Sequence, residues 1–156
     1  MKKYIITAMF SVLSAVSVLA QSKKDVQVSK LYSDYIGIKS ALASDDAGKA
    51  SAAAAAFIKT SSSARKALSE GQLNTLRKDA KTIADSKNIS VQRKTFHNLS
   101  DNMIALSKEY KLSEELVYVQ YCPMAEGSWL SDESKIINPY YGKSMLSCGS
   151  IKSTIK

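Results

Sequence analysis

The sequence predicts an all-α protein: an antiparallel four-helix bundle with a small irregular or β-structured C-terminal cap. Three observations support this fold class. Apolar residues recur every three or four positions over about residues 27–110, those residues contain no proline, and the composition changes abruptly after Lys111. We therefore expect one domain over residues 21–156, with the bundle at about 27–110 and the cap at about 113–152.

The N-terminal residues have the pattern of a cleaved signal peptide. Lys2 and Lys3 precede a mostly apolar run over residues 4–19, and Val18 and Ala20 occupy the small positions of a cleavage site. The run is shorter than the roughly 20 residues that a membrane-spanning helix needs. We expect cleavage after Ala20, a periplasmic or secreted location, and no integral membrane span in the processed chain.

Four amphipathic stretches supply the expected helices. A spacing of three and four places their inward positions on one helix face. These positions are Val28, Leu31, Tyr35, Ile38 and Leu42; Ala50, Ala54, Phe57, Ser61, Ala64 and Leu68; Leu73, Leu76, Ala80 and Ile83; and Phe96, Leu99, Met103, Leu106 and Tyr110. Ser69 and Gln72 form a capping-box pattern before the third stretch, and Ser90 is a candidate N-cap for the fourth. Short polar links favour antiparallel packing of chain neighbours.

The tail differs from the helical part in composition. Both prolines, both cysteines and the only tryptophan lie between Tyr118 and Gly149. Residues 116–121 are rich in β-branched and aromatic types and predict a short strand, whereas the prolines and glycines that follow predict turns. The tail is too short to fold alone, so we expect it to dock on the bundle. Its expected packing residues are Trp129, Pro139, Tyr140 and Gly142.

Sulfur chemistry is the main functional signal. Cys122, Met124, Met145 and Cys148 bring two thiols and two thioethers into one short segment. Soft sulfur ligands favour Cu(I) over hard cations, because a polarizable donor matches a polarizable ion. These four residues are therefore the candidate metal ligands, and Cu(I) is the one candidate cofactor.

Two alternatives use the same cysteines. In an oxidising compartment, Cys122 and Cys148 can form a disulfide that pins the tail, with both methionines as ordinary packing residues. A redox-active thiol pair is the other alternative, although the C-x-x-C spacing is absent.

Other function classes lack support in the sequence. The formal net charge is +8, but the basic residues are spread along the chain without interleaved aromatic residues, so we expect no nucleic-acid partner. His97 is the only histidine and lies beside the apolar stripe of the fourth stretch, where we expect it to be exposed or partly packed. No nucleophile–base pair and no phosphate-binding loop is recognisable, so we expect no enzymatic activity.

Several short pieces of the chain form a pattern that is not explained by helical periodicity. In the tail they are Cys122-Pro123-Met124-Ala125, Trp129-Leu130, Asn138-Pro139-Tyr140-Tyr141-Gly142, Met145-Leu146 and Cys148-Gly149; on the fourth stretch they are Gln92-Arg93, Phe96 and Leu99-Ser100; and on the first they are Tyr35 and Ala41-Leu42. With these pieces the chain resembles the family called domain of unknown function 3347, small exported bacterial domains that also occur at the C-terminus of periplasmic adaptors of heavy-metal efflux pumps. The similarity spans nearly all of residues 21–156.

The resemblance implies a helical bundle with a packed tail, and a non-enzymatic role in binding copper, silver or a similar soft metal linked to heavy-metal efflux or homeostasis. Envelope components of efflux systems are the implied partners. Family members often carry a histidine before the tail cysteine and two more on the fourth helix, where this chain has Tyr121, Val91 and Thr95. The alternative function is a structural or protein-interaction module of the cell envelope with a Cys122–Cys148 disulfide and no metal.

Overall fold

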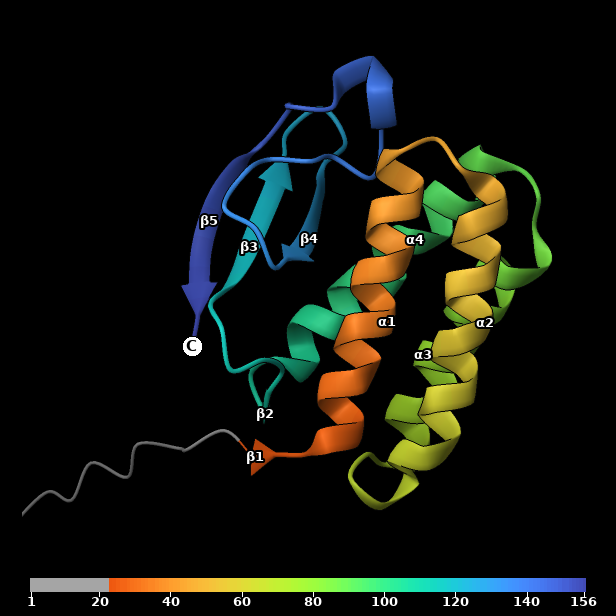
Figure 1. Cartoon of the computed structure of the whole chain (residues 1–156), viewed down its shortest axis with the longest axis vertical. Coiled ribbons are helices and arrows are strands. Elements are labelled where there is room, and N and C mark those ends of the chain that lie inside the picture. Colours follow the sequence, from red (N-terminus) through yellow and green to blue (C-terminus); the bar gives the residue numbers. More distant parts are fainter. Residues whose placement is uncertain (1–22) are drawn as a thin grey trace, which may run out of the picture.

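The computed structural model describes residues 23–156, and the expected signal peptide lies outside these described residues (Figure 1). Four helices follow one another, and each packs against the next along the chain. They are α1 (Val26–Ala43), α2 (Ala47–Ser63), α3 (Glu70–Asp85) and α4 (Ile89–Leu106), with a 3₁₀ turn, η1 (Ala64–Lys66), after α2. The prediction of four helices followed by a small strand-containing tail is confirmed.

The helices bury the stripes that the periodicity predicted. Every predicted inward position is buried, and the largest of these side chains include Tyr35, Phe57 and Phe96. Tyr110 is buried but not helical, because α4 ends at Leu106 and the chain turns there. Helical spacing therefore predicted the burial of Tyr110 correctly and its secondary structure wrongly.

Polar side chains fix where the helices begin. The capping box of Ser69 and Gln72 is present at the start of α3, as predicted. The expected cap of α4 was wrong: the N-cap is Asn88, whose side-chain oxygen accepts the N–H groups of Ser90 at 2.9 Å and Val91 at 3.3 Å. Ser90 lies inside the first turn of α4.

The cap is a three-stranded antiparallel sheet in the order β4-β3-β5, which Figure 1 shows at one side of the helices. Its strands are β3 (Val117–Cys122), β4 (Gly127–Ser131) and β5 (Ser150–Ile155), and η2 (Gly142–Met145) lies before β5. The expected strand at 116–121 corresponds to β3. Strand β5 extends beyond the expected cap boundary at residue 152. A separate parallel pair joins β1 (Lys23–Lys24) to β2 (Tyr110–Lys111).

A buried aromatic cluster attaches the cap to the helices. The Tyr35 hydroxyl accepts the N–H of Leu130 at 3.0 Å and lies 2.8 Å from the Ser100 hydroxyl, so that α1, α4 and β4 meet at one atom. Tyr140 packs edge-on against Trp129, with the ring centroids 5.8 Å apart. All four expected cap-packing residues are buried.

Arg93 makes a second attachment, through polar groups. Its guanidinium donates to the carbonyl oxygens of Pro139 at 3.0 Å and Leu42 at 2.7 Å, and it forms an ion pair with Asp45. The Arg93 hydrogen bond, together with the Lys143 N–H, lowers the pKa of Asp45 below its ordinary value. The start of η2 is therefore held against the α1–α2 link and α4.

Gly142 is required where this polar attachment meets the tail. Its φ is +57°, in the left-handed region, and an added Cβ would collide with the Arg93 guanidinium and the Asp45 carboxylate. We expect Gly142→Ala to lower the free energy of unfolding by about 1–3 kcal/mol, measured by urea denaturation.

Gly37→Ala is the matched control. Gly37 lies within α1, where an added Cβ would make an ordinary 3.5 Å contact with Ala53 Cβ. This variant should raise the free energy of unfolding by roughly 1 kcal/mol, because alanine is the better helix former. An unchanged free energy in Gly142→Ala would show that the left-handed turn and its close contacts are dispensable.

Candidate functional site

The sheet brings the two cysteines together. Cys122 is the last residue of β3, and Cys148 lies just before β5. Because β3 and β5 are antiparallel neighbours, with Tyr121 opposite Ser150, the end of one strand meets the start of the other. The Cys148 thiol hydrogen-bonds to the sulfur of Cys122, and both cysteines are free thiols.

Two residues hold the Cys148 segment against β3. The buried Asn138 side chain donates to the Cys148 carbonyl at 2.9 Å and accepts the Tyr140 N–H at 2.8 Å. Gly149 has a φ of +142°, and an added Cβ would lie only 2.9 Å from the Tyr121 carbonyl oxygen. The sequence suggested a turn at Asn138-Pro139, but not the role of Asn138 or Gly149 in bringing two thiols together.

The two thiols differ in burial and acidity. Cys122 is fully buried, whereas Cys148 is half-buried. Burial by itself raises the pKa of Cys122, but hydrogen bonds from the Cys148 thiol, the N–H groups of Ala125 and Met124 and the Asn138 side chain outweigh it, so the pKa lies below the ordinary value. The same thiol–thiol hydrogen bond, followed by burial, raises the pKa of Cys148. Cys122 therefore loses its proton first.

The methionines contact the thiol segment through main-chain groups. The Met124 N–H points at the thiols, and the Met124 carbonyl accepts the Tyr141 hydroxyl at 2.8 Å, while its side chain is 63% exposed. Met145 is half-buried, and its carbonyl accepts the Cys148 N–H at 3.0 Å. The structure thus brings the two predicted thiol ligands together, whereas the contacts of the two methionines with this segment are made by main-chain groups.

His97 is partly packed, as predicted. Its ring stacks on Tyr140 with the centroids 3.9 Å apart, and burial lowers its pKa. Among residues 23–156, no group of three or more histidine, cysteine, aspartate and glutamate side chains is placed to hold a metal ion. The thiol pair would therefore be the ionisable donor set of any ion bound here.

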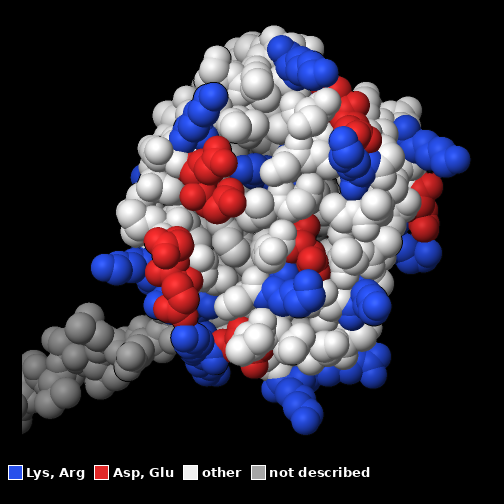
Figure 2. All heavy atoms as spheres, viewed as in Figure 1, with Lys and Arg blue, Asp and Glu red and all other residues white. Residues whose placement is uncertain are grey.

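Surface charge is mixed. On the face that Figure 2 shows, lysine and arginine side chains are scattered and acidic side chains lie among them. This face does not carry the continuous basic stripe typical of nucleic-acid binding proteins. No helix within residues 23–156 combines the length and the apolarity that crossing a membrane requires.

The fold and the thiol pair define a class of protein: a four-helix domain with a small β cap that carries two adjacent cysteines. The chain belongs to the family described as "Protein of unknown function (DUF3347)", whose model matches residues 31–115. The match runs from within α1 to the residues before β3, so it covers the helical part and leaves the thiol-bearing tail outside. Neither the curated proteins nor the solved structures gave a match.

The hydrogen bond between the thiols predicts an asymmetric titration. In the reduced protein, Cys122 should deprotonate below the ordinary thiol pKa of about 8.5 and Cys148 above it, as followed by the chemical shifts of ¹³C-labelled cysteine Cβ atoms. Cys148→Ala removes the thiol donor, so the pKa of Cys122 should rise. Cys122→Ala should lower the pKa of Cys148 for the converse reason.

Ser147→Ala is the control, because Ser147 is exposed and adjacent to Cys148. It should leave both titrations unchanged. If both thiols titrate together at the ordinary pKa, the sulfur–sulfur contact described here is wrong.

Proposed function

We propose that the protein is an exported, non-enzymatic component of the cell envelope that captures a soft monovalent metal ion, Cu(I) or Ag(I), between Cys122 and Cys148. The observation that carries this proposal is the contact between two free thiols, one of which has a lowered pKa. The thiolate is the form that binds metals, and soft sulfur ligands favour Cu(I).

The residues around the thiols fit this chemistry. The N–H groups of Met124 and Ala125 and the Asn138 side chain stabilise the Cys122 thiolate before any ion arrives. The half-buried Cys148 gives access to the buried Cys122. A bound ion supplies positive charge that favours loss of the second proton, from Cys148. The thioethers of Met124 and Met145 are proposed as weaker additional ligands.

The remaining parts of the proposal have other supports. Export is supported by the signal-peptide pattern of residues 1–20, and the efflux partners by the resemblance of the tail. The antiparallel order of the four helices is supported by the short links between chain neighbours, such as residues 44–46 between α1 and α2. A rigid helical body would then present the thiol pair at one end of the cap.

Metal binding predicts stabilisation by mass action. With Ag(I) as probe in a chloride-free buffer, the reduced protein should gain about 2.7 kcal/mol of unfolding free energy at a free ion concentration 100 times the Kd. Thermal or urea unfolding measures the gain. Cys122→Ser and Cys148→Ser should each abolish most of it, whereas Met124→Leu should retain most of it.

His97→Asn is the control on the protein side, and Ca²⁺ is the control on the metal side, because a hard cation does not select sulfur ligands. His97→Asn should respond to Ag(I) like the unmodified protein. A wild-type protein that gains no stability, or a double serine variant that gains as much, would refute capture by the thiols.

The same contact favours a second function, a structural or interaction module of the envelope closed by a Cys122–Cys148 disulfide. The two cysteines already adjoin, and they join the end of β3 to the segment before β5. Closing a loop of this length stabilises a protein by about 3–4 kcal/mol in the chain-entropy model. A disulfide and a two-thiolate metal site exclude each other.

The oxidation state in the envelope separates the two functions. The structural module predicts that protein isolated and alkylated without reductant carries no alkyl group, by intact mass. Metal capture predicts two alkyl groups after the ion is removed with a chelator. All alkylation is done in denaturant, because Cys122 is buried in the folded protein, and reduction beforehand should then give two groups in either case.

A further inference from the structure

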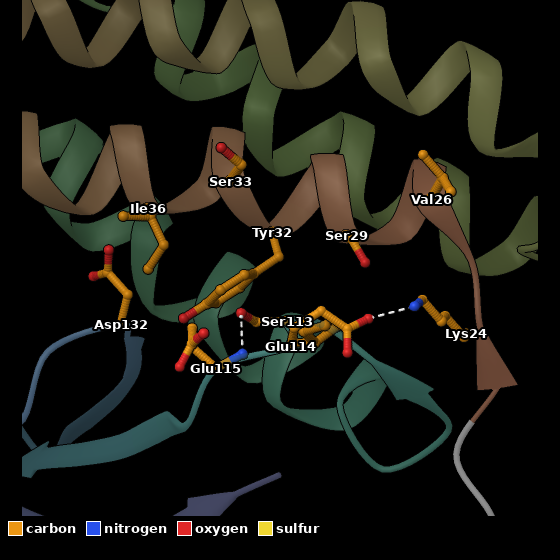
Figure 3. A pocket seen from close by; sticks show the side chains of 11 residues that line it. Lys24, Val26, Ser29, Tyr32, Ser33, Ile36, Ser113, Glu114, Glu115 and Asp132 are labelled. Atoms are coloured by element: carbon orange, nitrogen blue, oxygen red, sulfur yellow. Dashed lines mark hydrogen bonds and ion pairs between the residues drawn. The ribbon is translucent and has the colours of Figure 1, made fainter.

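A cavity lies at the end of β3 opposite the thiol pair. It lies between α1 and the segment that precedes β3, and its volume is about 710 Å³. Figure 3 shows Tyr32 extending from α1 toward residues 113–115, with Asp132 at one end of the cavity. A volume of this size is typical of sites for small molecules.

The Tyr32 hydroxyl has no hydrogen-bond partner among the described residues, unlike the hydroxyl of nearby Tyr35. The Tyr32 side chain is 5% exposed, and its buried hydroxyl makes no hydrogen bond with any described residue. Tyr35, on the same helix, has two partners for its hydroxyl. A buried polar group left unpaired costs about 1–3 kcal/mol, and phenylalanine would fill the same space without this cost. Burial and then Asp132 raise the pKa of Tyr32, so the phenol is neutral at pH 7.

The cavity lining is acidic, although the chain as a whole is basic. The charged lining residues are one lysine, Lys24, and three acids, Glu114, Glu115 and Asp132, in a chain of net charge +8. Glu114 is held by Lys24 and Lys111, and Asp132 lies 3.5 Å from the buried Lys39 amino group. The Glu115 carboxylate has no ion pair within the described residues.

Apolar side chains complete the walls. Val26 is 74% exposed, and Ile36 and Leu112 also line the cavity. A ligand that suits these surroundings combines an apolar body with a group that donates hydrogen bonds and carries positive charge. An anionic ligand would meet the unpaired Glu115 carboxylate and Asp132, so it is disfavoured.

We propose that this cavity binds a small organic amine in its protonated form. The ammonium group pairs with the Glu115 carboxylate, and a small shift of the Tyr32 side chain, whose hydroxyl is buried before the amine binds, lets the ammonium group donate to the Tyr32 hydroxyl oxygen. The apolar body lies against Val26, Ile36 and Leu112. The aromatic face of Tyr32 adds attraction for a cation. The proposal is independent of metal capture, because the cavity adjoins the start of β3 and the thiols lie at its end.

Three probes of equal chain length test the charge requirement: hexylammonium, 1-hexanol and hexanoate. Each is titrated into the ¹⁵N-labelled protein and followed by amide chemical shifts. Hexylammonium should give saturable shifts at residues 29–36 and 112–116, with a Kd at least about tenfold lower than that of either other probe, because it alone makes charge-assisted hydrogen bonds. Equal affinity for all three probes, or shifts confined to other residues, would overturn the proposal.

Two substitutions test the polar contacts. Tyr32→Phe and Glu115→Gln should each weaken hexylammonium binding about tenfold and leave 1-hexanol unchanged. Glu70→Gln, on the exposed first turn of α3, is the matched control and should bind hexylammonium normally. Tyr32→Phe should also unfold at the same or higher urea concentration, because it removes an unpaired buried hydroxyl. Unchanged hexylammonium affinity in both cavity variants would exclude this site.

Discussion

The position of the cap depends on the buried hydroxyl of Tyr35. It joins α1 to Ser100 of α4 and to the Leu130 N–H of β4, and the ring stacks on Phe96 at 5.1 Å. A buried phenol without hydrogen-bond partners costs free energy. The burial of the Tyr35 hydroxyl therefore holds these three elements together. Since β4 pairs with β3, this contact also fixes the strand that ends at Cys122. The core therefore positions Cys122, whereas Asn138 and the close approach at Gly149 position Cys148 beside it.

The helical part could be predicted because its signals are local. The inward stripes follow from a spacing of three and four residues, and Ser69 with Gln72 is a complete capping pattern within four positions. The errors occur where the local sequence is compatible with two different structures. Asn88 and Ser90 are both residue types that favour the N-cap position, and the structure uses Asn88. Tyr110 continues the helical spacing, but its hydroxyl bonds to the Ala67 carbonyl from a strand.

The cap was less predictable because its contacts are distant in sequence. Residues of β5 are almost all exposed, so the strand lacks the alternation of buried and exposed residues that reveals a half-buried strand. It is identified only by its pairing with β3. The sequence showed that the tail is rich in sulfur-containing residues. The contact between the two thiols, however, requires the antiparallel pairing of β3 with β5 and the close approach of Gly149 to the Tyr121 carbonyl. Nothing local shows that the hydroxyl of Tyr32 stays unpaired when that of Tyr35 does not.

The unequal burial of the thiols bears on which chemistry suits them. The more acidic thiol, Cys122, is the better nucleophile by thiolate content, but it is fully buried, whereas the accessible Cys148 keeps its proton to higher pH. Exchange with a large external disulfide needs an exposed thiolate, so this arrangement slows it. In the proposed capture, a metal ion is much smaller than a protein disulfide and would meet the more accessible Cys148 first. The arrangement of the pair thus supports the proposal of ion capture over disulfide exchange with another protein, and oxidation within the pair is the reaction that would compete with the proposed capture.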